Sequence, residues 1–115
     1  MQRIAFLMRI QPGTEEEYQR RHTAVWPEML SELTAAGCRS YSIFQSGLQL
    51  FAYLEVEDAD HYQDYLAESP VAARWEAFMS DILVREVDPV TNFPPLLPEV
   101  FHLGDGFPPG KDSLS

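Results

Sequence analysis

Residues 38–56 read CRSYSIFQSGLQLFAYLEV, and this stretch decides the fold. Apolar and polar side chains alternate on both sides of Ser46-Gly47, a dipeptide typical of a turn. A period of two predicts strands, one over 38–45 and one over 48–56. Because so few residues separate the two runs, we expect them to pair as a β-hairpin.

The residues before the hairpin predict one strand and two helices. Residues 3–10 alternate apolar side chains onto one face, which indicates a strand. Thr14 followed by Glu17 has the pattern of a capping box, in which each side chain satisfies a backbone N–H at the start of a helix. We therefore expect a helix from about residue 15 to 24.

Pro27 predicts a break in this helical region, because proline lacks an N–H and clashes with the preceding turn. Proline suits a first helical position, so a second helix should begin there. Gly37 is a good residue to end it.

The residues after the hairpin predict two more helices and a strand. A helix opens at 57–60, and Ser69-Pro70 breaks it. The helical pattern resumes over 72–83, and 100–103 reads as a short final strand.

This order is β-α-β-β-α-β, which predicts an α+β, ferredoxin-like fold. We expect one domain over 1–103 and a tail without periodic pattern over 104–115. Helices should cover one face of the sheet only. The other face carries Phe44, Phe51 and Tyr53, so we expect a homodimer through the sheet faces, a substrate pocket on that face, or both.

The charge distribution excludes polyanionic partners. The net charge is −10, and residues 1–39 sum to zero, so the surplus lies in 40–115. No basic stripe is present, and an acidic chain repels phosphate groups. We therefore expect neither nucleic acid nor an anionic membrane as a partner.

Localisation is inferred from cysteine and hydropathy. Cys38 is the only cysteine and cannot form an internal disulfide, which favours a reducing cytoplasm. The apolar run 4–8 is too short for a secretion signal, and no run approaches the length of a membrane helix.

His22 is the most informative side chain for chemistry. It follows Tyr18 by four residues, so both lie on one face of the predicted helix, near its C-terminal end. Helix ends of this kind favour protonated histidine, and the pKa of histidine lies near working pH. His22 is therefore either a proton-transfer catalyst or a half-buried structural histidine.

Other polar and aromatic residues are ambiguous. His61 and His102 lack the spacing of a zinc motif relative to His22, so we expect no metal site. Cys38 is expected to be a structural thiol. Trp75 and Tyr41 are each either packing residues or walls of a ligand pocket.

The string Glu17-Tyr18-Gln19-Arg20-Arg21-His22, followed by Trp26-Pro27-Glu28, resembles the L-rhamnose mutarotase family. Further matches follow in order: Gly37, Tyr41, Arg74-Trp75, Met79 and Glu99-Val100-Phe101. The resemblance spans about residues 1–103.

The resemblance implies an enzyme that interconverts the α and β anomers of L-rhamnose. It implies a cytoplasmic homodimer with a dimeric α/β-barrel fold and no cofactor. His22 matches the family's catalytic proton donor, and Tyr18, Tyr41 and Trp75 match sugar-binding positions. Glu76 departs from the family, which carries a second tryptophan there; its carboxylate is expected to hydrogen-bond a sugar hydroxyl instead.

Two alternatives stay open at this stage, because fold does not fix function. The chain could be a cofactor-free monooxygenase or a haem-handling protein of the same fold, with His22 as the axial ligand. It could also be a sugar-binding or dimerisation module without activity.

Overall fold

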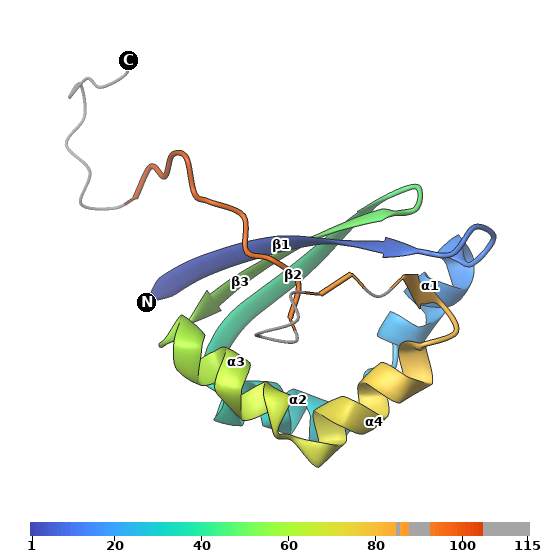
Figure 1. Ribbon diagram of the computed structural model, residues 1–115, viewed down its shortest axis with the longest axis horizontal. Helices are drawn as coiled ribbons and strands as arrows, with labels where there is room; N and C mark the ends of the chain where they lie inside the picture. The colour runs from blue at the N-terminus through green and yellow to red at the C-terminus, as the bar shows by residue number, and fades with distance from the viewer. Residues whose placement is uncertain (85, 88–92, 105–115) are drawn as a thin grey trace.

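The computed structural model describes residues 1–84, 86–87 and 93–104. The elements follow in the order β1 (Gln2–Ile10), α1 (Glu15–His22), α2 (Pro27–Ala35), β2 (Cys38–Ser46), β3 (Gln49–Val56), α3 (Ala59–Ala67), α4 (Pro70–Met79) and β4 (Leu83–Val84). The strands form an antiparallel sheet in the order β2-β3-β1-β4. All four helices lie on one face of this curled sheet (Figure 1). The predicted α+β class and β-α-β-β-α-β order are confirmed.

The alternation in the sequence sets the inner face of the sheet. In β1, Ile4, Phe6 and Ile10 are buried, whereas Leu7 between them is exposed. Every second residue of β3, from Leu50 to Val56, is fully buried. These side chains form the core against the helices, because residues two apart in a strand share a face.

The break between the first two helices is confirmed. Helix α1 ends at His22, two residues earlier than predicted, and Pro27 is the first residue of α2. Gly37 follows α2 with φ +94°, a conformation that glycine adopts without the penalty of a Cβ.

The predicted capping box is wrong. The Thr14 hydroxyl donates to the Gln11 carbonyl at 2.6 Å, and Glu17 binds Arg20 and Arg21. The carbonyl of Gln11 lies within reach of the hydroxyl because the chain turns tightly there; the Thr14 N–H also donates to it. The local sequence could not show whether the Thr14 hydroxyl would bind a helix N–H or the Gln11 carbonyl.

The predicted final strand over 100–103 is also wrong. The fourth strand is β4, at Leu83–Val84, and the sequence had placed its first residue in the last helix. Helix α4 ends at Met79, and the chain then turns so that the Ile82 carbonyl accepts from Gln11 N–H at 2.8 Å. A strand of two residues shows no period of its own, so the helical pattern extended over it.

The C-terminal segment passes from the inner side of the sheet to the edge of β1. The Phe93 ring meets Phe6 edge-on at 5.0 Å, and Leu97 N–H donates to the Ala5 carbonyl at 2.7 Å. Beyond the Arg3–Glu99 ion pair the segment leaves the body of the molecule (Figure 1). Val100 there is 94% exposed. The predicted tail, from residue 105 on, lies outside the described residues.

The outer face of the sheet carries an uncovered apolar row. Phe44 pairs with Phe51 across β2 and β3, and Phe51 pairs with Leu7 across β3 and β1. Their exposed fractions are 64%, 41% and 41%, in the order Phe44, Phe51, Leu7. We call these three residues the outer row. The expectation of an apolar, helix-free sheet face is confirmed.

Candidate active site

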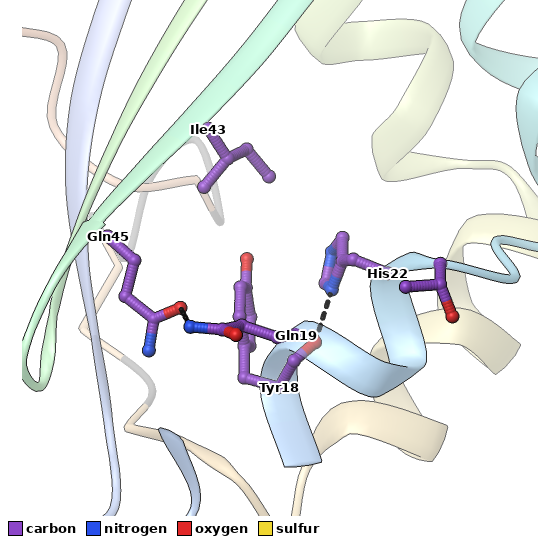
Figure 2. A pocket seen from close by; sticks show the side chains of 6 residues that line it. Tyr18, Gln19, His22, Ile43 and Gln45 are labelled. Atoms are coloured by element: carbon purple, nitrogen blue, oxygen red, sulfur yellow. Dashed lines mark hydrogen bonds between the residues drawn. The ribbon is translucent and has the colours of Figure 1, made fainter. Parts of the chain in front are cut away.

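A cavity of about 790 Å³ lies between the inner face of the sheet and the helices. A second cavity of about 230 Å³ adjoins it, and both are lined by His22 and Ile43. Four of the five predicted site residues line the larger cavity: His22, Tyr41, Trp75 and Glu76. The fifth, Tyr18, lines the smaller one (Figure 2). The structure therefore brings together side chains from α1, β2 and α4.

His22 is the last residue of α1 and lies beside Tyr18, as the spacing of four predicted. The two rings stack with centroids 4.2 Å apart, and the His22 Nδ1 lies 3.1 Å from the Tyr18 carbonyl oxygen (Figure 2). A carbonyl oxygen only accepts, so Nδ1 carries the hydrogen in this contact. The other ring nitrogen, Nε2, is thereby left with the lone pair of the neutral imidazole.

Burial sets the charge state of His22. Removal from water lowers its pKa below the ordinary value, and the hydrogen bond to the Tyr18 carbonyl only partly opposes this. The helix end was expected to favour the protonated form, but desolvation dominates. His22 is therefore a neutral base at neutral pH.

The sequence left two roles open for Trp75, packing residue or cavity wall, and its position fits both. Its ring meets Trp26 edge-on at 5.0 Å and His22 edge-on at 5.7 Å, and it also lies 5.5 Å from Phe78. It also lines the larger cavity. Trp75 therefore both packs against its aromatic neighbours and lines the cavity.

The Tyr18 and Tyr41 hydroxyls are neutral hydrogen-bonding groups. Burial raises the pKa of both phenols, so neither ionises near neutrality. Burial is the cause for Tyr18 and the largest cause for Tyr41, and the Tyr18 phenol is one of the groups that further raise the pKa of Tyr41. The two hydroxyls thus lie in one neighbourhood, where both can donate to and accept from a polar ligand.

Arg21 fixes α1 against α4, a contact that sequence reasoning missed. Its guanidinium donates to the Phe78 carbonyl at 2.9 Å, to Asp81 at 2.9 and 3.1 Å, and to Glu17 at 2.7 Å. It also lies 4.7 Å from the centre of the Phe78 ring. The arginines at 20 and 21 hold the pKa of Glu17 at about 2. Only the Glu17–Arg21 spacing of four was visible in the sequence.

The amides of Gln19 and Gln45 join α1 to β2 on the wall of the smaller cavity. Gln19 Nε2 donates to Gln45 Oε1 at 3.1 Å (Figure 2). The chain position of these glutamines gave no signal, because twenty-six residues separate them.

The other candidates lie apart from the cavity. His61 and His102 are exposed. Cys38 is buried, its Sγ lies 3.4 Å from the Ser40 carbonyl, and burial raises the pKa of its thiol, as expected of a structural cysteine. Within the described part of the chain, no group of three or more metal-ligating side chains is arranged to hold an ion, and no helix there is long and apolar enough to cross a membrane.

Comparison with known proteins identifies similar sequences and structures. The family model described as L-rhamnose mutarotase matches residues 3–103. An L-rhamnose mutarotase of Burkholderia orbicola is 44% identical over 107 residues, covering 90% of this chain and 99% of the relative. One of Listeria monocytogenes is 42% identical with the same coverage.

Two solved structures share the fold. The L-rhamnose mutarotase FA22100 of Formosa agariphila superposes with a TM-score of 0.73 at 33% identity, over 90% of this chain and all of that one. Rv0793 of Mycobacterium tuberculosis, at 18% identity and a TM-score of 0.51, resembles the chain in fold alone. The family resemblance noted in the sequence is confirmed.

Proposed function

The chain belongs to the L-rhamnose mutarotase family, and we propose that it interconverts the α and β anomers of L-rhamnose or a related 6-deoxyhexose. The observation that carries this function is the family match over residues 3–103. The proposed function is supported by a neutral histidine on the wall of a cavity large enough to hold a sugar. The monooxygenase and haem alternatives are not supported by this family match.

In the proposed reaction, His22 moves the protons. Its Nε2 accepts the proton of the anomeric hydroxyl while the ring oxygen receives a proton from water, and the ring C–O bond breaks. The aldehyde then rotates about its C1–C2 bond. The ring hydroxyl adds to the opposite face of the carbonyl, and the same groups return the protons. General acid–base catalysis of this kind contributes roughly 10²–10⁴-fold.

The other cavity residues would hold the sugar. Tyr18 and Tyr41 offer neutral hydroxyls, and Glu76 would accept from a sugar hydroxyl. The Trp75 ring offers an apolar surface to the C–H face of the pyranose. Leu33 of α2 and Leu66 of α3 line the cavity with apolar surface suited to the C6 methyl group.

The test is anomer exchange of L-rhamnose followed by NMR saturation transfer. His22→Ala should remove the acceleration, a fall of roughly 10²–10⁴-fold in kcat. His61→Ala is the matched control, because His61 is exposed on α3. A folded His22→Ala protein that exchanges anomers at the wild-type rate would exclude His22 as the acid–base group.

The same samples separate the remaining alternatives. A protein that binds L-rhamnose without accelerating exchange is a binding module. Addition of haemin with the growth of a Soret band that His22→Ala abolishes would favour haem handling.

We propose a homodimer in which a second copy covers the outer row, as in the sheet-to-sheet barrels of this fold class. The row is continuous across three strands and is too apolar to be left in water without cost. A second copy of this chain carries the same apolar row, so the two rows can cover each other about a two-fold axis. We also propose a cytoplasmic location and no nucleic-acid or membrane partner, in keeping with the lone cysteine and the charge of −10.

A further inference from the structure

Tyr62 of α3 lies on the wall of the larger cavity, on a different element from the site residues described above. It is 1% exposed and belongs to the same core cluster as Phe6 and Cys38, against which Tyr41 packs. The Phe93 ring meets it edge-on at 6.1 Å. The ring is therefore fixed by packing on several sides.

The Tyr62 residue is buried, but its hydroxyl is not satisfied by the protein. Across residues 1–84, 86–87 and 93–104, no hydrogen bond to it is found, whereas the hydroxyl of Tyr65 on the same helix donates to Glu32 at 3.2 Å. No side-chain oxygen or nitrogen in that part of the chain is both fully enclosed and without a partner. The Tyr62 hydroxyl therefore touches open space, and for a residue this buried that space is the cavity.

Tyr62, Tyr41 and His22 line the same cavity, each from a different element. Tyr41 packs against the core cluster that contains Tyr62. The Tyr41 phenol is also one of the groups that raise the pKa of Tyr62, in keeping with this proximity. A sugar whose anomeric carbon lies at His22 would therefore have Tyr41 and Tyr62 as further hydroxyl partners on the wall of the same cavity.

A hydroxyl that reaches the cavity without a protein partner can be satisfied there by water or by a ligand. Phenylalanine would pack the ring without this hydroxyl. The Tyr62 hydroxyl therefore contributes no hydrogen bond to the fold and is available to a polar ligand in the cavity.

We propose that Tyr62 is a further substrate-binding residue, whose hydroxyl hydrogen-bonds the C3 or C4 hydroxyl of the pyranose, on the side of the ring away from the anomeric carbon. This rests on the proposed function for the identity of the sugar. The role is one of binding and specificity, because Tyr62 touches neither the anomeric hydroxyl nor the proton that His22 moves.

The experiment compares Tyr62→Phe with the wild type in NMR anomer exchange over a range of L-rhamnose concentrations. KM should rise by roughly three- to tenfold, the loss of one neutral hydrogen bond, with kcat within about twofold. The thermal midpoint without sugar should stay equal or rise. An unchanged KM, or a clearly lower midpoint, would overturn the proposal, because the hydroxyl would then be idle or structural.

Deoxy sugars identify the partner hydroxyl. With 3-deoxy- or 4-deoxy-L-rhamnose, one of the two should have the same KM in wild type and Tyr62→Phe, while 2-deoxy-L-rhamnose keeps the full difference. Equal differences with all three analogues would overturn the assignment. Tyr65→Phe is the matched control on the same helix and should leave KM unchanged.

Calorimetric titration with L-rhamnose separates this proposal from the proposed function. A wild type that binds the sugar without exchanging anomers ends the mutarotase proposal, and the dissociation constants of wild type and Tyr62→Phe still decide the role of Tyr62. A wild type that neither binds nor exchanges L-rhamnose contradicts both.

Discussion

Arg21 and Asp81 join the end of α1 to the turn after α4, through hydrogen bonds of 2.9 and 3.1 Å. The Arg21 side chain is only 13% exposed, and it also donates to the Phe78 carbonyl. His22 follows Arg21 directly, and Trp75 lies one turn before Phe78. The guanidinium therefore joins the two parts of the chain whose residues His22 and Trp75 meet edge-on at 5.7 Å.

Replacing Arg21 with methionine should lower both stability and exchange. Loss of the guanidinium frees α1 from α4, and we expect kcat to fall by about tenfold, since small displacements of a catalytic group cost rate steeply. Arg21→Lys should recover part of the lost kcat. Arg20→Met is the matched control, because among the described residues the Arg20 side chain bonds only Glu17, on its own helix. Equal effects of the two substitutions on kcat would contradict the positioning role.

The pH dependence should report the depressed pKa of His22. Because burial favours the neutral form, kcat/KM should be constant near neutrality and fall at acid pH, with a midpoint below the ordinary value of about 6.5. The spontaneous exchange rate is subtracted at each pH. A midpoint above 6.5 would show that His22 is stabilised as the cation instead.

The same shift predicts a small stability change. The unfolded chain takes up a proton at His22 near pH 6.5 and the folded chain does so only at lower pH, so this contribution is present above pH 6.5. It is lost as the pH falls from there toward the folded pKa. Urea titrations of wild type and His22→Ala at pH 7.5 and 5.5 measure it, and the wild type should lose more.

Tyr18→Phe should weaken the reaction while leaving the fold intact. The Phe ring keeps the stacking on His22 but loses the hydroxyl next to Tyr41, so we expect a roughly three- to tenfold loss in kcat/KM. Tyr53→Phe serves as control, because Tyr53 donates to Glu55 through its own hydroxyl and does not line either cavity. Wild-type kinetics for Tyr18→Phe would reduce Tyr18 to a packing residue.

Glu76→Trp tests the departure from the family pattern. A second indole beside Trp75 would add apolar surface at the cavity wall, so KM for L-rhamnose should fall by about two- to fivefold. Glu76→Ala should raise KM if the carboxylate accepts from a sugar hydroxyl. If neither change alters KM, position 76 does not contact the sugar.

Phe51→Asp should dissociate the proposed dimer. It places a charge at the centre of the outer row, where a second copy would have to desolvate it. Sedimentation velocity over a range of concentrations should show a dimer for the wild type and a monomer for the variant. Gln49→Asp, on the same strand, is the charge-matched control. A wild type that stays monomeric at high concentration would remove the dimer.

The sequence by itself determined most of the elements, because their signals are local. The alternation over 3–10 and 38–56 reflects the period of a strand with one buried face, and it gave β1, β2 and β3. Pro27 and Pro70 start helices because of their own covalent geometry. The spacing of four residues placed Tyr18 and His22 on one face of their helix, because such residues are neighbours on a helix surface.

Tertiary structure decided what depends on residues far apart in the chain. The two-residue strand β4 exists because β1 offers it hydrogen bonds at Arg9 and Ile10, which no local pattern records. The link from Arg21 to Asp81 spans sixty residues. Burial had a larger effect on the charge of His22 than the helix end did, and it keeps the ring neutral. The Tyr62 hydroxyl faces the cavity because surrounding side chains hold its ring there. Packing sets these contacts and the local dielectric, so they follow from the assembled fold rather than from any one segment.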